Sequence, residues 1–246
     1  MGKRNIKLTL MYDGTAYHGF QRQKNGITIQ ECLENAIFKI TGEKATVTGC
    51  GRTDAGVHAE AYVANFFTVS SIECEKLPFA LNANLPEDIR VFGAEDMEEN
   101  FHARYSAKRK TYAYKIVNRP FSDVFLSRYS WFYPAKLDIG KMKLAAEKIV
   151  GKHDFAAFMA AGSPVLSTVR TVFSLDVSEK NSVINIEVCA DGFLYNMVRI
   201  IVGTLVYAGC GKINPDDVSD IIFSGDRVRA GVTAPPQGLM MKEVIY

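Results

Sequence analysis

The sequence predicts an α+β fold in which two units of like pattern share one mainly antiparallel sheet with helices packed on it. Three observations support this fold class. Strand-like segments with alternating apolar residues occur in both halves of the 246 residues, single helix-like segments lie between them, and no low-complexity segment separates the halves. We place the boundary near residues 100–108, with an N-terminal domain of residues 1–105 and a C-terminal domain of residues 106–246.

The N-terminal half contains a well-marked helix. Thr28 and Glu31 form a capping box at its start, apolar residues then recur every three or four positions, and Gly42 follows as the C-terminal cap. Alternation and turn residues predict the other elements of this half. They are strands at residues 6–12, 45–50, 62–68 and 89–94, and a short helix at residues 72–81.

The C-terminal half has a similar rhythm. Residues 169–177 and 183–188 alternate and predict an antiparallel hairpin that turns near residues 180–181. An asparagine cap, a proline and two acidic residues at 214–217 predict the start of a helix. The other predicted elements are strands at residues 111–117 and 239–245 and helices at residues 139–149, stopped by Gly151, and 194–208.

Composition and charge exclude several classes of protein. A hydrophobic share of 48% and a charged share of 23% are typical of a globular protein and exclude a disordered or collagen-like one. The net charge of +2 neither requires nor excludes nucleic acid, because a local basic surface can be hidden in the total. The N-terminus has no signal-peptide core, and the longest apolar run, residues 200–210, is too short for a membrane span. We therefore expect a soluble cytoplasmic protein.

The sequence lacks the usual motifs for cofactors and metals. No glycine-rich phosphate-binding motif lies between a strand and a helix, and there is no nucleophile elbow. The five cysteines contain no C-x-x-C pair, and the four histidines have no ligand spacing. We expect no cofactor, no metal site and no disulfide framework.

The first candidate site is a polar loop at residues 51–59, with the sequence GRTDAGVHA. Its glycines allow a sharp turn and the close approach of another molecule. An ionised Asp54 can act as a nucleophile, and Arg52 can bind a phosphate. On residue types alone a structural turn is the favoured alternative, with Asp54 capping a backbone N–H and Arg52 solvated.

The second candidate is a basic segment at residues 102–119 that contains no acidic residue. Its basic residues include Lys108, Arg109 and Lys110, and three tyrosines interleave with them. Basic groups bind phosphates and aromatic faces stack on unpaired bases, a combination typical of single-stranded RNA binding. The alternative is an ordinary amphipathic strand with solvated lysines.

A third candidate is Arg199, which interrupts an apolar helical run. A guanidinium in such a run needs either an anionic partner or access to solvent. The two interpretations are therefore an ion pair with a carboxylate of the site and an arginine that extends to the surface.

Taken together, these segments resemble the tRNA pseudouridine synthase A family over nearly the whole chain. Five segments carry the resemblance in order. They are YDGTAYHGFQ at residues 12–21, GRTDAGVHA at 51–59, KTYAY at 110–114, FLYNMVR at 193–199 and AGVTAPPQGL at 230–239. One departure is Phe20, which stands where the family often has tryptophan and changes packing only.

The resemblance implies two ferredoxin-like halves with the active cleft between them, and isomerisation of uridine to pseudouridine at positions 38, 39 and 40 of the tRNA anticodon stem-loop. It implies a catalytic Asp54, a Tyr112 that contacts the target uracil, and an Arg199 that pairs with Asp54. Arg52 would contact a backbone phosphate or occupy the place of the flipped nucleotide. A homodimer that needs no cofactor is also implied. Phosphate contacts are expected from Arg22, Lys24, Lys108, Arg109 and Lys110.

Two other classes of function stay open. A non-catalytic RNA-binding module of ferredoxin-like build would use the same basic segment, and only the enzyme requires a carboxylate at residue 54. A retaining glycosidase would need a second carboxyl as general acid, for which we find no candidate in the sequence. Whether Asp54 attacks the sugar or takes up a sugar proton does not follow from the residues.

Overall fold

The computed structural model describes residues 2–162 and 165–246, and the chain divides into two compact units. Unit 1 contains the residues up to Lys108 together with Met241–Tyr246, and unit 2 contains Arg109–Met240. The C-terminal end of the chain therefore belongs to the unit that carries Asp54. Tyr112 and Arg199 lie in unit 2.

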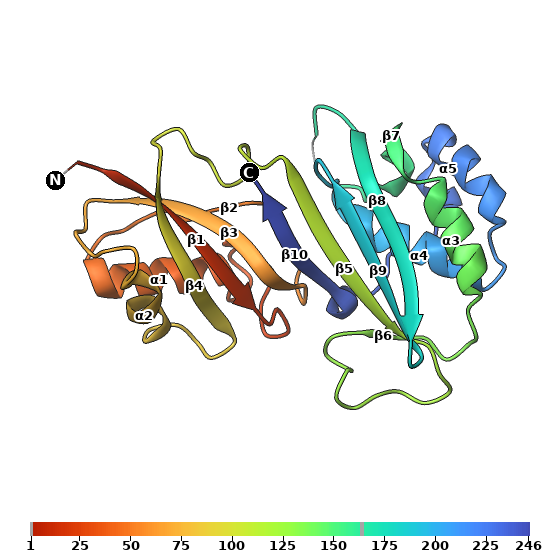
Figure 1. The fold of residues 1–246 in the computed structure, drawn as a ribbon, viewed down its shortest axis with the longest axis horizontal. Coiled ribbons are helices and arrows are strands. Elements are labelled where there is room, and N and C mark those ends of the chain that lie inside the picture. Colours follow the sequence, from red (N-terminus) through yellow and green to blue (C-terminus); the bar gives the residue numbers. More distant parts are fainter. Residues whose placement is uncertain (1, 163–164) are drawn as a thin grey trace. The chain divides into compact units, whose positions relative to one another are not determined.

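Unit 1 is an antiparallel sheet with two helices (Figure 1). The strand order is β4-β1-β3, and β2 pairs with β3. The last strand, β10, follows β3 in this order, and its residues from Met241 onward belong to unit 1. The elements are β1 (Arg4–Tyr12), α1 (Ile29–Thr41), β2 (Thr48–Gly49), β3 (His58–Thr68), α2 (Leu77–Asn82), β4 (Ile89–Met97) and β10 (Leu239–Ile245).

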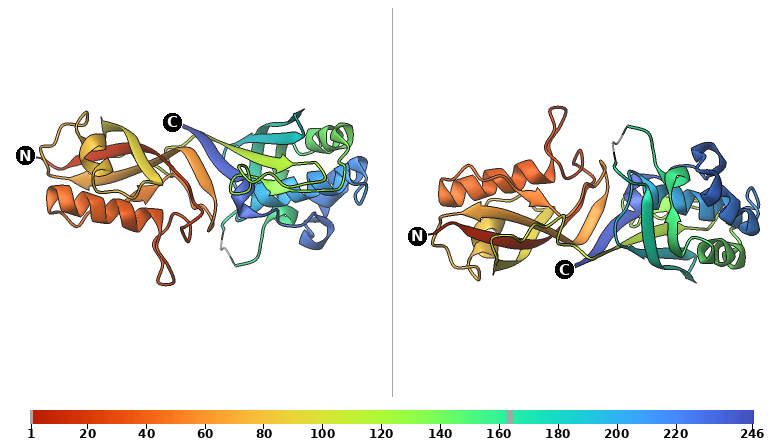
Figure 2. Two further views of the ribbon diagram at one scale, coloured as in Figure 1. Left: turned by 90° about the horizontal axis from the view of Figure 1, so that it is seen from below. Right: turned by 90° about the horizontal axis from the view of Figure 1, so that it is seen from above.

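The core of unit 1 lies between its sheet and α1, which runs along one face of the strands (Figure 2). Ile6, Leu8 and Leu10 alternate along β1 and are fully buried. The helix begins as predicted, because the Thr28 side chain accepts a hydrogen bond from the N–H of Glu31. It ends at Gly42, whose φ of 75° is the left-handed conformation expected of a glycine cap.

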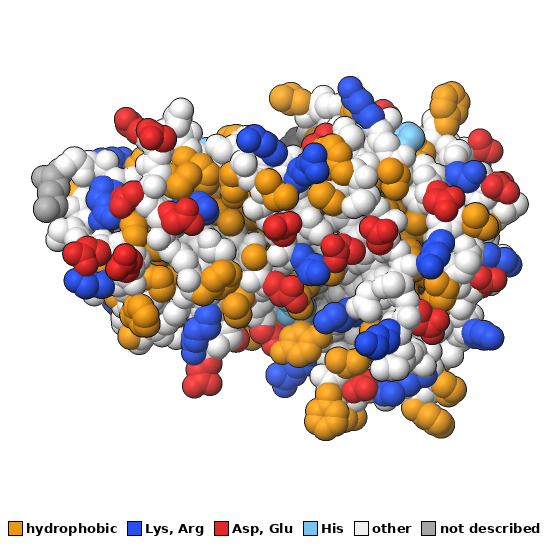
Figure 3. Space-filling view, in the orientation of Figure 1, with side chains coloured by type: hydrophobic (Ala, Val, Ile, Leu, Met, Phe, Trp, Pro, Cys, Tyr) orange, Lys and Arg blue, Asp and Glu red, His pale blue; other side chains and the backbone are white. Residues whose placement is uncertain are grey.

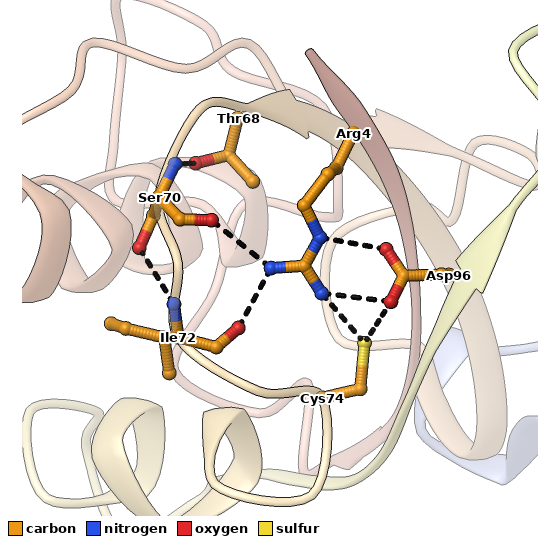
Figure 4. Close-up of polar contacts among 6 residues, drawn as sticks. All are labelled: Arg4, Thr68, Ser70, Ile72, Cys74 and Asp96. Atoms are coloured by element: carbon orange, nitrogen blue, oxygen red, sulfur yellow. Dashed lines mark hydrogen bonds and ion pairs between the residues drawn. The ribbon is translucent and has the colours of Figure 1, made fainter. Parts of the chain in front are cut away.

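A polar cluster at Arg4 ties the end of β3 to β1 and β4 (Figure 4). The Arg4 guanidinium donates to the main-chain oxygens of Ser70 and Ile72 and to both carboxylate oxygens of Asp96, at 2.8–3.0 Å. The hydrogen bond from Arg4 holds the pKa of the Asp96 carboxyl below its usual value. Burial, with Asp96 beside it, raises the pKa of the Cys74 thiol to about 11. The cluster therefore holds these three segments together, and the Cys74 thiol within it is protonated at neutral pH.

Unit 2 has strand order β5-β9-β8-β7, with antiparallel pairing throughout this path and the short β6 pairing parallel to β5. Helix α4 lies behind β8 and β9 in Figure 1 and is buried over most of its length. The elements are β5 (Arg109–Val117), β6 (Trp131–Phe132), α3 (Ile139–Glu147), β7 (Gly151–Asp154), β8 (Val169–Lys180), β9 (Val183–Ala190), α4 (Met197–Gly209) and α5 (Val218–Ser224), with short 3-10 helices at Ala156–Phe158, Pro215–Asp217, Arg227–Arg229 and Pro236–Gly238.

The predicted fold class is confirmed: single helices accompany a large, mainly antiparallel set of strands. The bounds of β10 match the prediction at residues 239–245, and the hairpin of β8 and β9 turns at Asn181 and Ser182, both with positive φ. The ferredoxin-like character of each half and a cleft between the halves stay predictions.

Three local predictions were wrong in extent. The helix expected at 72–81 is shortened to α2, which begins at Leu77. Pro78 lies in its first turn and has no N–H to bond a carbonyl of a preceding turn, so the helix does not extend further toward the N-terminus. The strand expected at 45–50 is reduced to β2, since the N–H of Val47 donates to the Glu34 carboxylate instead of to a strand. Gly151 does not directly end α3, which stops at Glu147, but begins β7.

Candidate active site

Asp54 lies in the loop between β2 and β3 and is half-buried. The N–H of Val57 donates to the main-chain oxygen of Asp54 at 3.2 Å and closes a tight turn. Gly56 has a φ of +77° at the third position of this turn, a conformation that glycine adopts without strain. The bond that closes the turn therefore uses the main chain of Asp54 and not its carboxylate.

The loop rests on the segment at residues 12–21, the first of the family-like motifs. A Cβ on Gly19 would lie 2.3 Å from the Thr53 oxygen, and a Cβ on Gly14 would lie 2.0 Å from the Val57 oxygen. The N–H of Phe20 donates to the Thr53 oxygen at 3.2 Å. The two motifs, far apart in sequence, therefore pack main chain against main chain on either side of Asp54.

Buried tyrosines fix the start of the same loop. The Tyr12 hydroxyl forms a 2.9 Å hydrogen bond with the Thr53 hydroxyl, and burial raises the pKa of Tyr12, which keeps it neutral. The Tyr62 hydroxyl donates to the Gly51 oxygen, and the Phe20 ring stacks on Tyr62 with centroids 4.3 Å apart. Phe20 thus supports the loop by packing, in line with the role expected where the family often has tryptophan.

Tyr112 is the fourth residue of β5 and is only 7% exposed. Its ring packs edge-on against Phe193, with centroids 5.2 Å apart. Strand alternation puts Tyr112 and Tyr114 on the same face, and Tyr114 is fully buried. The tyrosines of the basic segment therefore do not share one exposed face, and Tyr105, at 75%, is the exposed one of the three.

Arg199 lies in the first turn of α4 and is half-buried. Its Nε donates to the Ala234 oxygen at 2.7 Å, and one terminal nitrogen donates to the Asn196 side-chain oxygen at 2.9 Å. These two neutral acceptors help to orient the guanidinium. The sequence did not reveal these two acceptors, and the one on Ala234 is a backbone oxygen, which has no side-chain signature.

The last family-like motif, residues 230–239, holds Arg199 in place. The N–H of Ala234 donates back to the Arg199 oxygen at 3.0 Å, and the N–H of Gly231 donates to the Thr204 hydroxyl at 2.9 Å. The Tyr114 hydroxyl donates to the Pro235 oxygen at 2.7 Å. This motif therefore connects α4 to β5, the two elements that carry Arg199 and Tyr112.

The five predicted phosphate-binding residues differ in their local surroundings. Arg22 pairs with Glu31 and Glu34 at 3.2 and 3.0 Å, which offsets its charge, whereas Lys24 and Lys108 are exposed. On β5, consecutive side chains point to opposite faces. Lys110 consequently shares the face of Tyr112, while Arg109 lies on the other face with its guanidinium 4.5 Å from the Phe173 ring centroid.

Charges of both signs are interspersed over the face of the molecule in Figure 3. Among the described residues, no cluster of three or more His, Cys, Asp or Glu side chains could hold a metal ion. None of the helices in the described ranges has the length and apolar character needed to cross a bilayer.

These features define an α+β protein with a carboxylate-bearing loop in one unit and an oriented tyrosine and arginine in the other. Comparison of the sequence with protein families identifies it further. The sequence model of a family described as tRNA pseudouridine synthase matches residues 9–106 and 145–246, well over half of the chain. The chain belongs to this family.

Individual relatives match along their entire length. A protein named tRNA pseudouridine synthase A from Thermoanaerobacter sp. (strain X514) is 55% identical over 243 residues. Proteins of the same name from Clostridium botulinum (strain Alaska E43 / Type E3) and Acetivibrio thermocellus are 51% and 46% identical over 243 residues. In each case the match covers 99% of this chain and 100% of the relative.

Proposed function

We propose that this chain isomerises uridine to pseudouridine at positions 38, 39 and 40 of the tRNA anticodon stem-loop, in the cytoplasm and without a cofactor. The single observation that best supports this is the loop GRTDAGVHA, in which a half-buried Asp54 begins a turn that main-chain contacts hold in place. Membership of the tRNA pseudouridine synthase family supports the reaction class.

The reaction rearranges one nucleotide and needs no external group. The N1–C1′ bond breaks, and the uracil leaves with the electron pair. The ring then turns and forms a C5–C1′ bond, after which the proton on C5 is removed and N1 gains a proton. Atoms and electrons balance within the nucleotide, so a positioned acid–base or nucleophilic group is sufficient.

Asp54 is the catalytic carboxylate in this proposal. A carboxylate suits work at an anomeric carbon, where it can attack C1′ or stabilise positive charge and take up a sugar proton. Both routes need the carboxylate ionised and held in position. The turn closed between Asp54 and Val57, with Thr53 bonded to Tyr12, supplies a preorganised backbone for it.

Three further residues contact the substrate or orient Asp54. Tyr112 stacks on or hydrogen-bonds the target uracil and assists removal of the C5 proton. Arg52 contacts a backbone phosphate or fills the place of the flipped nucleotide. Arg199 pairs with Asp54 and favours its charged form. The contacts of Arg199 with Asn196 and Ala234 support this role, because they hold the guanidinium in a defined position.

We also propose a homodimer in which one tRNA contacts both subunits. Phosphate contacts come from Lys24, Lys108 and Lys110, with weaker contributions from Arg22 and Arg109. The weaker assignments follow from the ion pairs of Arg22 with α1 and from the face of β5 on which Arg109 lies.

Carbodiimide mapping of pseudouridine in tRNA incubated with purified protein tests the function. Native protein should modify positions 38, 39 and 40, and Asp54→Asn should modify none while still binding tRNA. The isosteric change keeps the main-chain turn, so the variant should still unfold cooperatively in urea as a folded protein. Pseudouridine formation by Asp54→Asn at the native rate would favour the non-catalytic RNA-binding module and end the assignment of Asp54.

A further inference from the structure

Unit 1 contains a cavity of about 250 Å³ beside the loop of Asp54. Arg52 lines it from that loop, and His102, Arg104 and Tyr105 line it from the segment after β4. A volume below the roughly 300–1,000 Å³ of small-molecule sites suits one fragment of a polymer better than a free metabolite. Arg52, which lines the cavity, precedes Asp54 by two residues in the same loop. A ligand bound to Arg52 would therefore contact the loop that carries the catalytic carboxylate.

The chemistry of the lining favours an anion with an aromatic portion. None of the described residues that line the cavity is acidic, and two of them, Arg52 and Arg104, carry guanidinium groups. The Tyr105 ring is 75% exposed and lies 4.4 Å from the His102 ring, centroid to centroid. The Arg104 guanidinium lies 5.5 Å from the Tyr105 ring centroid. Guanidinium groups bind phosphates, and an exposed aromatic face stacks on a nucleobase.

Hydrogen bonds hold the segment of residues 102–105 in place. The N–H of Ala103 donates to the buried Asn65 side chain at 2.9 Å, and the Tyr246 hydroxyl donates to the Ala103 oxygen at 2.8 Å. The N–H groups of Arg104 and Tyr105 donate to Nδ1 of His102, at 3.1 and 3.4 Å. Nδ1 is therefore an acceptor, and Nε2 of the neutral ring carries the hydrogen and is a donor. Preorganised groups lose little entropy when a ligand binds.

Other residues that line the cavity are also closely packed. A Cβ on Gly49 would lie 2.1 Å from the Tyr62 hydroxyl oxygen and 2.5 Å from the Phe20 ring, so the chain approaches both rings closely. Phe20 and Gly49 both line the cavity. Glycine at residue 49 therefore allows close packing against these rings, and this packed part of the lining has little freedom to move when a ligand binds.

We propose that this cavity binds a nucleotide that flanks the target uridine, with Arg52 and Arg104 on its phosphate and the base stacked on Tyr105. The inference rests on the proposed function for the identity of the RNA, and it adds His102, Arg104 and Tyr105 as substrate-binding residues. It also explains why the segment after β4 is basic and aromatic although the tyrosines of β5 are buried.

The test uses anticodon stem-loop RNA that carries 2-aminopurine at one loop position at a time, because stacking quenches its fluorescence. Tyr105→Ala should remove the quenching at one position and raise the Kd about 5- to 150-fold, whereas Tyr105→Phe should keep both near native. Arg104→Ala should lower the slope of log affinity against log salt by about 0.7. Phe79→Ala, an equally exposed aromatic of unit 1, is the matched control and should change neither.

The outcomes separate this inference from the proposed function. If native protein forms pseudouridine but Tyr105→Ala and Arg104→Ala bind the stem-loop like Phe79→Ala, the cavity is not a nucleotide site. If polyglutamate displaces the RNA equally from native protein and Tyr105→Ala, the cavity is only a polyanion surface and the inference also fails. If native protein forms no pseudouridine while binding depends on Tyr105 and Arg104, the cavity stays an RNA site and the proposed reaction is wrong.

Discussion

Gly203 is packed so closely against the main chain that even alanine should destabilise the protein at this position. It lies inside α4, and a Cβ built on it would be 1.7 Å from the Val232 oxygen. Contacts under 3.0 Å do not occur for real Cβ atoms, so Gly203→Ala must displace the backbone at residue 232 by roughly 1.3 Å. The displaced segment continues to Ala234, which bonds Arg199 through both its N–H and its oxygen.

The expected cost follows from three contributions. Overpacking against a backbone costs about 1–3 kcal/mol. Loss of the hydrogen bond between the Arg199 guanidinium and the Ala234 oxygen costs about 1.5–3 kcal/mol, because its donor is charged. Alanine in place of glycine in a helix returns about 1 kcal/mol. Gly203→Ala should therefore lower the free energy of unfolding of unit 2 by about 1.5–5 kcal/mol.

Trp131 makes the measurement specific to unit 2, since it is the only tryptophan and lies on β6. Urea unfolding followed by its fluorescence should show a lower midpoint for Gly203→Ala at an unchanged slope. Gly209→Ala, in the same helix, is the matched control. Its new Cβ meets chiefly the flexible Met142 side chain, so its stability should stay within about 1 kcal/mol of native. A midpoint for Gly203→Ala at or above that of Gly209→Ala would refute the reasoning.

Three other predictions concern the substrate-binding face and the stability of unit 1. Tyr112→Phe should keep tRNA binding and lose turnover if the hydroxyl moves a proton, while Tyr112→Ala should also weaken binding by about 1–3 kcal/mol; native kinetics in both would leave Tyr112 with a packing role only. Lys110→Ala should lower the salt slope of tRNA affinity more than Arg109→Ala, because the two lie on opposite faces of β5; equal slopes would contradict this assignment. Asp96→Asn should destabilise unit 1 slightly at neutral pH. The hydrogen bond from Arg4 lowers the pKa of Asp96 in the folded protein. The stabilisation by Asp96 is therefore present above the unfolded pKa and is lost as pH falls through the folded pKa. The free energies of unfolding of native protein and variant should converge as the pH is lowered below about 4.

The sequence predicted elements well where the local signal and the tertiary structure agree. The helix α1 has a capping box, an apolar stripe and a glycine cap, and all three are present in the structure. The hairpin of β8 and β9 alternates cleanly because one face of it is buried. Elements whose extent depends on a distant partner were predicted poorly. The shortening of β2 follows from a hydrogen bond between Val47 and Glu34, thirteen positions apart, which no local pattern reveals.

The candidate site shows the same division. Asp54, Tyr112 and Arg199 could be selected from motifs, because the side-chain type alone indicates what chemistry each residue can perform. The face on which each residue of the basic segment lies could not be seen while the whole segment was treated as one surface. Alternation along β5 then separates Lys110 from Arg109 and buries Tyr114. The two-residue periodicity of a strand was the sequence signal that separates these residues onto two faces.

The glycines of the family-like motifs explain why those motifs are longer than the chemistry requires. Gly14 and Gly19 bring residues 12–21 into main-chain contact with the loop of Asp54, and Gly231 brings the last motif against α4, where a Cβ would lie 2.3 Å from the Gly203 carbonyl carbon. A site held by backbone contacts cannot relax by changing a rotamer, so its reactive groups keep their positions. Substitutions at these glycines should consequently lower turnover through displacement of Asp54 or Arg199, although none of them contacts the RNA in the proposed mechanism. The motifs therefore describe the support of the site as much as its chemistry.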